Sequence, residues 1–541
     1  MINPAVTPRQ RTRAVGAALH ALLSGVEGKI SRVFALDLRS LAAFRIGLAL
    51  LIIADLARRS TDLVAHYTDQ GILPRAALAD TRLSERLSLH LLTGSWEGEA
   101  ALFAMAAAIA VLLLVGYQTR LVTIVSLVLL ISLHNRNPLV LSGADTLLRV
   151  ILFWAIFLPC GARWSVDSIR RRPGARVPVT VSNIATMAFV LQVAFLYLFA
   201  ALLKSGNDWR SDGTAVYYAL SLGQLSTPLG EALLRYPDLL TVMTRGILAV
   251  ELLGPLLLIA PIWTSRLRLV GIVLLGLLHL GFGLLLANLG LFPYIDFLAL
   301  IALIPSVCWD RWATRLAGVS RPGRHHVTGR ALPCPALAAS SWVARVRGLR
   351  PRIASSWRIG GTPTAPDRVG QLSPLLTVMA ACALVHITLA NLSTLPGSPY
   401  HMPWLLGGVG RFIGLNQGWT MFAPNVLKDS TWYVARGTLS NGRQVDVYNN
   451  RDEVVFDRPP SIAETYPNDH WFRYLESFGN AEMESKRPYF GAYLCRQWNA
   501  VHAEADHVEQ VEVIALRQRV LLDDRGLGPR QDVILVYPCQ G

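Results

Sequence analysis

The chain has 541 residues, of which 52% are hydrophobic and only 16% are charged. This composition excludes an ordinary soluble protein and indicates a polytopic α-helical membrane protein. The formal net charge is +15, but the arginines gather in loops on one side of the apolar segments. The charge therefore indicates control of membrane topology, and no nucleic-acid partner is predicted.

Residues 1–40 precede the first apolar segment. They lack an apolar core followed by a small-residue cleavage site, so no cleaved signal peptide is predicted. The stretch "AVGAALHALLSGVEGKISRVF" has spaced apolar residues and basic ends, which is typical of an amphipathic helix lying on a membrane surface. We assign this region to the cytoplasmic side.

Apolar runs of about the length needed to cross a bilayer recur along the first three quarters of the chain. About nine spans are predicted, at 41–57, 99–117, 121–134, 146–161, 184–203, 240–262, 267–287, 289–306 and 373–391. The third and fourth are short, so they are either tilted or partly buried spans or the two arms of a re-entrant hairpin. Residues 41–307 are thus predicted to form a transmembrane bundle, with 373–391 as the last helix.

Segment 308–372 interrupts the apolar runs. It is rich in Arg, Pro, Gly, Ala and Ser and contains eleven Arg against two Asp, which predicts a disordered cytoplasmic insertion. The positive-inside rule then places the N-terminus in the cytoplasm and residues 392–541 outside it.

The composition changes after the last span. "TWYVARGTLSNGRQVDVYNN" alternates apolar and polar residues around a Ser-Asn-Gly turn, which predicts a β-hairpin. "QVEVIALRQRVLLD" and "QDVILVYP" predict further strands, and "HWFRYLESFGNAEMESKRPYFGAYLCRQWNAV" predicts helix. Residues 392–541 are therefore predicted to form an extracytoplasmic domain of β-rich or mixed α/β type.

The six cysteines show no CxxC spacing, so no metal site is predicted. Cys495 and Cys539 both fall in the predicted outer domain, where a disulfide is chemically permitted. Their separation in space does not follow from the sequence, so a disulfide and two free thiols both remain open.

Several polar groups fall at membrane depth, where they are costly and suggest function. They lie between the third and fourth spans, in the seventh span and just after it: His134, Arg136, Asn137, Asp145, His279 and Asn288. Together they predict an outward-facing polar pocket. Taken singly, some have a structural explanation, in which His279 bonds a backbone carbonyl and Arg136 pairs with Asp145 across a short loop.

Two further charges lie in the first span. Arg45 and Asp55 are ten residues apart, which is nearly three helical turns. They cannot pair with each other, so each is predicted to find its partner on another helix.

Lys204 ends the fifth predicted span, directly before the loop "SGNDW". A lysine in this position either extends its amine to the lipid headgroups or serves as a buried base. Burial favours the neutral amine that a base requires, and Asp208 would oppose this effect if it pointed at Lys204.

Four stretches, "LDLRSLAAFRIGLALLIIADLARRSTDLVAHYTDQGILPR", "GADTLLRVILFWAIFLPCGARWSVD", "LLKSGNDW" and "GLFPYIDF", resemble the horizontally transferred transmembrane (HTTM) domain. This domain is the membrane part of vitamin K-dependent gamma-carboxylase and its bacterial relatives. The resemblance continues more weakly through "NQGWTMFAP", the "LSNGRQVDV" hairpin and "HWFRYLESF". It implies an enzyme of the bacterial inner membrane.

The resemblance also implies roles for particular residues. Lys204 stands five residues before Trp209, the position of the family's proposed base, and Leu203 replaces the first lysine of the family's pair. The family's loop histidine falls on Asn137 or nearby, with His134 close enough to substitute. In this scheme neutral Lys204 deprotonates a reduced quinone and oxygen adds. The resulting strong base then removes a glutamate γ-proton so that carbon dioxide can add.

The implied cofactors are a reduced quinone of the vitamin K or menaquinone type, with O2 and CO2 and without a metal. Membrane lipids and a secreted peptide or protein are the implied partners. A non-enzymatic alternative is an HTTM scaffold that binds or matures a secreted partner. A transporter is disfavoured because the sequence shows neither paired broken helices nor a repeated half.

Overall fold

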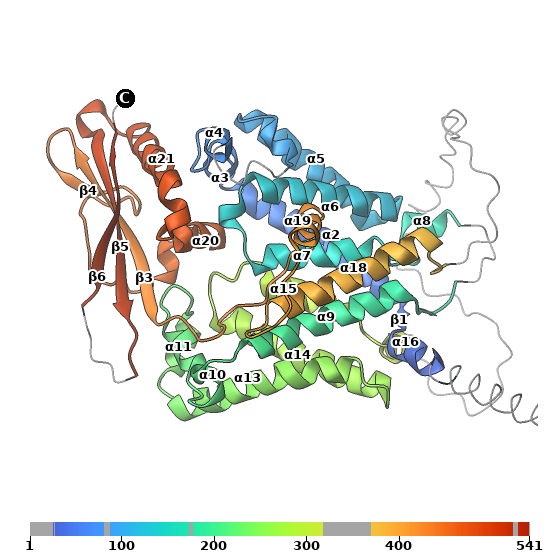
Figure 1. Ribbon diagram of the computed structural model, residues 1–541. Helices are drawn as coiled ribbons and strands as arrows, with labels where there is room; N and C mark the ends of the chain where they lie inside the picture. Colours follow the sequence, from blue (N-terminus) through green and yellow to red (C-terminus); the bar gives the residue numbers. More distant parts are fainter. Residues whose placement is uncertain are drawn as a thin grey trace, which may run out of the picture.

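The computed structural model describes residues 25, 27–79, 87–171, 177–316, 369–522 and 528–539. The predicted surface helix of residues 1–40 and the predicted insertion 308–372 lie largely outside this range. Two parts are visible in Figure 1, a bundle of long helices and a C-terminal domain built on a β-sheet.

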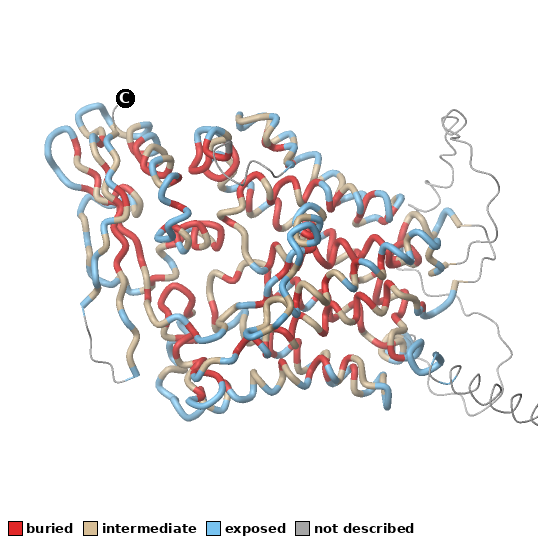
Figure 2. The backbone as a smooth tube through the Cα atoms, viewed as in Figure 1, coloured by how far each residue is buried: buried red, intermediate tan, exposed pale blue. Residues whose placement is uncertain are grey.

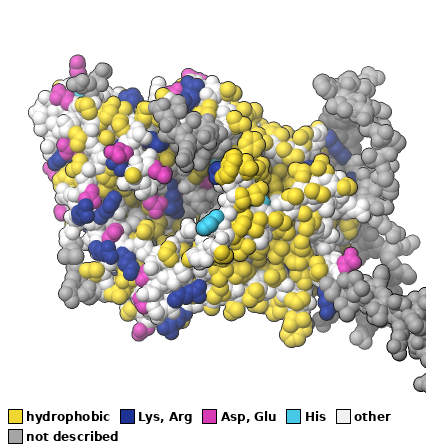
Figure 3. Space-filling view, in the orientation of Figure 1, with side chains coloured by type: hydrophobic (Ala, Val, Ile, Leu, Met, Phe, Trp, Pro, Cys, Tyr) yellow, Lys and Arg dark blue, Asp and Glu magenta, His cyan; other side chains and the backbone are white. Residues whose placement is uncertain are grey.

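Seven helices of the described chain are long and apolar enough to cross a membrane. They are α2 (Leu38–Ser60), α5 (Trp96–Val115), α6 (Thr119–Arg136), α9 (Ile184–Leu203), α13 (Pro237–Leu258), α14 (Thr264–Leu285) and α18 (Pro374–Ser393). An eighth candidate is a pair bent by 85°, α15 (Phe292–Ile301) with α16 (Ser306–Leu316). Hydrophobic side chains cover the visible face of this bundle, whereas charged side chains are spread over the C-terminal domain (Figure 3).

The predicted fourth span, 146–161, is shorter than a membrane-crossing helix. It forms α7 (Gly143–Ala155), whose 13 residues extend about 20 Å against a hydrocarbon core of about 30 Å. Ser142 caps its N-terminus in a capping box with Asp145. Most of α7 is buried (Figure 2), so its apolar run reflects a position inside the protein.

The two ends of the bundle differ. At the domain end, α2 ends where Arg58 pairs with Asp469 of the C-terminal domain. At the distal end, β1 (Leu36–Asp37) pairs with β2 (Thr180–Val181), and Arg268 donates to the carbonyl oxygens of Leu258 and Ala35. Also at the distal end are the last residue of α16, the first residue of α18, and the short turns with Arg120 and Arg266. The predicted orientation would make that end cytoplasmic.

Short elements connect the long helices. On the domain side these are α3 (Leu63–Tyr67), α4 (Arg75–Ala79), η2 (Leu89–Leu91), η3 (Pro138–Val140), α10 (Asn207–Arg210), α11 (Ala215–Ser221) and α12 (Pro228–Leu233). On the distal side lies α8 (Val166–Ile169). Several of the domain-side elements contribute to one hydrophobic core together with the C-terminal domain, which joins the two parts firmly.

The C-terminal domain is a four-stranded antiparallel sheet in the order β4-β3-β5-β6. Its strands are β3 (Asp429–Leu439), β4 (Gln444–Asp446), β5 (Val508–Arg519) and β6 (Arg530–Pro538). The predicted hairpin is formed by β3 and β4, and Gly442 in its turn has φ of +82°. The predicted mixed α/β domain is thus confirmed.

Helices form the layer of this domain that faces the bundle (Figure 1). They are α20 (Asp469–Phe478) and α21 (Arg487–Asn499), with the short turns η4 (Ala463–Thr465), η5 (Ala481–Lys486) and η6 (Glu504–Asp506). A disulfide links Cys495 of α21 to Cys539 after β6, with a Cα separation of 5.6 Å. It ties the helical layer to the edge of the sheet.

The chain between α18 and the sheet packs on the bundle. Helix α19 (Trp404–Phe412) exposes apolar side chains, and Gly414 then turns the chain with φ of +75°. Gln417 exchanges hydrogen bonds of 2.8 and 3.2 Å with Gln192, in the middle of α9. Residues 415–421 therefore re-enter the bundle before the C-terminal domain begins.

Candidate active site

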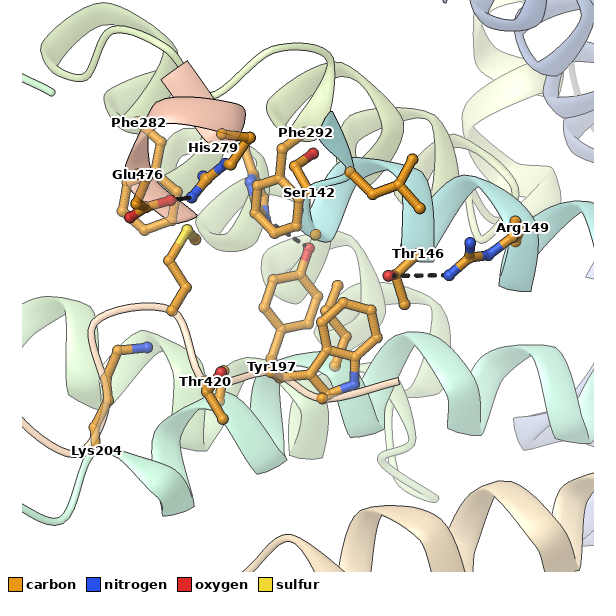
Figure 4. A pocket seen from close by; sticks show the side chains of 18 of the residues that line it. Ser142, Thr146, Arg149, Tyr197, Lys204, His279, Phe282, Phe292, Thr420 and Glu476 are labelled. Carbon is orange, nitrogen blue, oxygen red and sulfur yellow. Dashed lines mark hydrogen bonds and ion pairs between the residues drawn. The ribbon is translucent and has the colours of Figure 1, made fainter. Parts of the chain in front are cut away.

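A cavity of about 620 Å³ lies where the bundle meets the C-terminal domain. Its walls come from α7, α9, α13, α14 and α15, from the re-entrant residues 418–421, and from α20 with the residues that follow it. Figure 4 shows the labelled side chains that face this space. The volume is in the range of small-molecule sites, and the wall combines apolar groups with a few ionisable ones.

Lys204 lines this cavity and is buried, with 4% of its surface exposed. Its Nζ donates to both carboxylate oxygens of Glu251 on α13, at 2.9 and 2.7 Å. The amine also lies 5.1 Å from the ring centroid of Trp209. Lys204 therefore does not extend to the headgroups, and it forms a buried ion pair at the cavity wall.

The loop after α9 fixes the position of Lys204. Arg210 donates from Nε to the Lys204 carbonyl oxygen at 2.9 Å, and Trp209 donates from Nε1 to the Phe422 carbonyl oxygen at 2.8 Å. Asp208 is engaged elsewhere, because Lys428 donates to its carboxylate at 3.0 Å. The negative charge that faces Lys204 is thus Glu251, a residue not predicted from the sequence.

His279 of α14 lines the same cavity, so two of the sequence-predicted pocket residues do come together. Its Nε2 lies 3.1 Å from the hydroxyl oxygen of Tyr197, which also lines the cavity from α9. Its Nδ1 lies 3.5 Å from Oδ2 of Asp296 on α15. His279 therefore bonds side chains, and the alternative of a backbone-carbonyl partner is wrong.

A second polar cluster lies beside the cavity, centred on Arg59. This buried guanidinium donates to Asp55 at 2.8 Å, to the hydroxyl of Tyr67 at 2.7 Å, and to Asp145. His134 Nε2 lies 3.3 Å from Asp145. Arg59 belongs to α2 itself, so the prediction that Asp55 pairs with another helix is wrong: its partner is one turn further along the same helix.

Asp55, His134 and Asp145 bring their ligand atoms within 4.8 Å of one another, close enough to hold a metal ion. The guanidinium of Arg59 already supplies positive charge to both carboxylates. This arrangement is an ion network centred on Arg59, and a cation would have to displace Arg59 from it.

The predicted Arg136–Asp145 ion pair is not formed. Arg136 is buried and donates to the Leu73 carbonyl oxygen at 2.8 Å, while Asp145 is bound by Arg59. The reason is geometric, because Arg136 closes α6 and points toward the segment after α3, whereas Asp145 lies in the first turn of α7 and faces α2.

Three other predicted residues have backbone partners outside the cavity. Asn137 donates to the His66 carbonyl oxygen at 2.9 Å, and Asn288 donates to that of Gln224 at 2.9 Å. Arg45 donates to the Trp164 carbonyl oxygen at 2.6 Å. This partner lies in the loop before α8, so the prediction of a partner on another helix is wrong for Arg45 as well. These side chains secure the loops at the bundle ends.

His66 lies at the junction of the two parts, with its ring centroid 4.7 Å from that of Trp471 of α20 and the two rings tilted by 53°. Burial lowers the pKa of His66 to about 4. The unfolded chain binds a proton at His66 below pH 6.5, whereas the folded chain does not until about pH 4. Stability must therefore fall as the pH falls through this window.

We expect His66 to cost on the order of 2 kcal/mol of stability between pH 6.5 and pH 5. Thermal unfolding of the detergent-solubilised protein at these two pH values measures the loss. His66→Phe should shrink it by about that amount, whereas His401→Phe, at an exposed position, should leave it unchanged. An equal pH-dependent loss in the wild type and His66→Phe would contradict the prediction.

The fold and the cavity define a polytopic membrane protein with a buried ionisable pair at the junction of its bundle and its C-terminal domain. Comparison with known families agrees with this class. The chain matches the HTTM domain over residues 35–309, just over half of its length, and it belongs to the HTTM-domain family. No curated protein and no solved structure matches the chain.

Proposed function

We propose that this HTTM-domain protein is a membrane enzyme of the gamma-carboxylase type. It would use a reduced quinone and oxygen to remove a proton from a glutamyl or similar substrate, which is then carboxylated. The observation that carries the proposal is the buried amine of Lys204 on the wall of the 620 Å³ cavity. A lysine in such surroundings is a recurrent functional base.

The cavity wall fits a quinone ring. Apolar and aromatic side chains line it from several helices and from the re-entrant segment: Leu196, Leu278, Phe282, Phe292, Trp419 and Met421. Tyr197 of α9 and Lys204, directly after the end of α9, add polar groups to the wall. A reduced quinone held here supplies two phenolic hydroxyl groups and the electrons that reduce oxygen.

Lys204 acts in this proposal together with Glu251. The pair carries no net charge whether its proton lies on the amine or on the carboxylate, so moving the proton between them adds no net buried charge. When the proton lies on Glu251, the neutral amine of Lys204 is free to accept a hydroxyl proton from the cavity. Glu251 therefore holds Lys204 in place and also makes its neutral form accessible.

The C-terminal domain completes the site. Arg473, Glu476 and Ser477 of α20 line the cavity opposite the membrane helices, and Arg473 donates to Glu476 at 2.6 Å. A peptide presented by this domain would reach the cavity from the side away from the lipid. This arrangement supports a secreted peptide or protein as the substrate.

The test uses the purified full chain in lipid nanodiscs with reduced menaquinone, oxygen, labelled bicarbonate and a glutamate-containing peptide. We expect oxygen-dependent quinone epoxide and labelled peptide. Lys204→Ala should lower both by about 10²- to 10⁴-fold, as for loss of a general base. Lys428→Ala makes the same change at a lysine outside the cavity and should keep most of the activity.

Two results would overturn the proposal. Equal activity of Lys204→Ala and the wild type would remove Lys204 from the chemistry. If the wild-type protein formed neither quinone epoxide nor labelled peptide, the proposed enzyme would be rejected and the non-enzymatic scaffold favoured.

A further inference from the structure

Three buried side chains from three helices meet at one wall of the cavity. Tyr197 of α9 points toward His279 of α14 (Figure 4), and its hydroxyl oxygen lies 3.1 Å from His279 Nε2. On the other side of the imidazole, Nδ1 lies 3.5 Å from Oδ2 of Asp296, whose exposed surface is 0%. The Tyr197 hydroxyl and the Asp296 carboxyl also lie near enough to interact directly. A hydroxyl, an imidazole and a carboxyl group gathered in this way can form a proton relay.

Buried polar atoms of both His279 and Asp296 lack the hydrogen bonds that a purely structural network would provide. Neither Nδ1 of His279 nor either oxygen of Asp296 makes a hydrogen bond of good geometry with any described residue. Leaving such groups unpaired typically costs about 1–3 kcal/mol each. Catalytic hydrogen bonds are often long before substrate binds and tighten afterwards. Only the outer member, Tyr197, and the imidazole line the cavity.

We propose that Tyr197, His279 and Asp296 form a proton relay that opens into the cavity at the Tyr197 hydroxyl and acts as a second acid–base group beside Lys204. The inference rests on the proposed function for the reaction it serves. Tyr197 and His279 are the catalytic members. Asp296 is a positioning residue, because it holds the imidazole with its Nδ1 proton inward and balances the charge when His279 is protonated.

The overall reaction needs two such groups. Quinol, oxygen, carbon dioxide and a C–H substrate become quinone epoxide, carboxylate, water and one proton, with four electrons passing from the quinol to oxygen. Both hydroxyl protons must leave the quinol. Lys204 takes one and later releases it to solvent.

The relay handles the other hydroxyl proton. Tyr197 accepts it while passing its own proton to His279, and the relay then returns a proton to the oxygen atom that leaves as water. The bond from that oxygen to the quinone carbon breaks as the new O–H bond forms. The second hydrogen of the water comes from the substrate carbon, so atoms and charge balance.

The activity test uses Tyr197→Phe, which removes only the hydroxyl oxygen, and Asp296→Asn, which keeps the side-chain shape. Each should lower epoxide formation by about 10²- to 10⁴-fold with little change in the KM for quinol. The double variant should be no slower than the slower single variant, because the groups act as a unit. Tyr217→Phe removes a hydroxyl that donates to the Leu521 carbonyl oxygen outside the cavity, and it should remain active.

A second measurement does not depend on turnover. Nitrogen-15 NMR of histidine-labelled protein, with His279→Gln to assign the signals, reports the state of each ring nitrogen of His279. Tyr197→Phe should shift the Nε2 signal, and Asp296→Asn should shift both signals. Unchanged His279 signals in both variants would overturn the relay. If the His279 signals shifted as expected but the protein oxidised no quinol, the relay would be supported and the proposed function would be rejected.

Discussion

Glu251→Ala is expected to destabilise the folded protein by about 3–5 kcal/mol, because it leaves the buried amine of Lys204 without its counter-ion. The two side chains are almost fully buried and joined by two hydrogen bonds. Chemical denaturation in a fixed detergent measures the free energy of unfolding. Arg75→Ala breaks an exposed pair with Asp69 and should cost about 1 kcal/mol or less.

A double variant separates stability from chemistry. Lys204→Met with Glu251→Leu replaces the pair by apolar side chains of similar size, and such replacements are often neutral or stabilising. We expect it to recover most of the stability lost in Glu251→Ala and to lack quinol oxidation. If Glu251→Ala were as mild as Arg75→Ala, the pair would contribute little, and its role in holding Lys204 would be wrong.

The helices of the bundle were predictable because the bilayer leaves few choices. A run of about 20 apolar residues must satisfy its backbone groups within one helix, and the predicted spans at 41–57, 184–203 and 373–391 coincide closely with α2, α9 and α18. Hydropathy does not distinguish lipid from protein surroundings. The buried helix α7 therefore looked like a span although it is too short for one.

The C-terminal domain was predictable where the sequence carried local signals. The Ser-Asn-Gly turn located the β3–β4 hairpin, and the alternating runs located β5 and β6. The start of the domain was not marked in this way. Gln417 looks like a loop residue in the sequence, and only its pairing with Gln192, 225 residues away, shows that the chain re-enters the bundle there.

Only part of the candidate site could be predicted from the sequence, because residues far apart in the chain form it. Lys204 and His279 stood out as polar groups at membrane depth, and they share the cavity. Glu251 carried the same signal, a lone charge in the apolar run 240–262, but its partner is 47 residues away, directly after the end of another helix. Tyr197 carried no such signal, since tyrosine is common in membrane helices. Helix packing, which one sequence does not reveal, brings these groups together.

Arg59→Met is expected to destabilise the folded protein about as much as Glu251→Ala does. This variant tests the ion network beside the cavity. The substitution keeps an apolar side chain of similar length but leaves Asp55 and Asp145 buried without the guanidinium that binds both. Removing one partner of a buried ionic cluster typically costs about 3–5 kcal/mol. Unfolding in detergent should show this loss, with Arg58→Met as a control at the neighbouring, more exposed arginine.

The triple variant Arg59→Met with Asp55→Asn and Asp145→Asn removes the uncompensated charges and should regain a substantial part of the lost stability. The network also touches the C-terminal domain, because Asp145 and Asp469 line one small gap together with Arg58. Arg59→Met should therefore also loosen α20 from the bundle, measurable as faster hydrogen exchange over 469–478. Wild-type stability and exchange in Arg59→Met would show that Arg59 is dispensable and that the carboxylates find their counter-charge elsewhere.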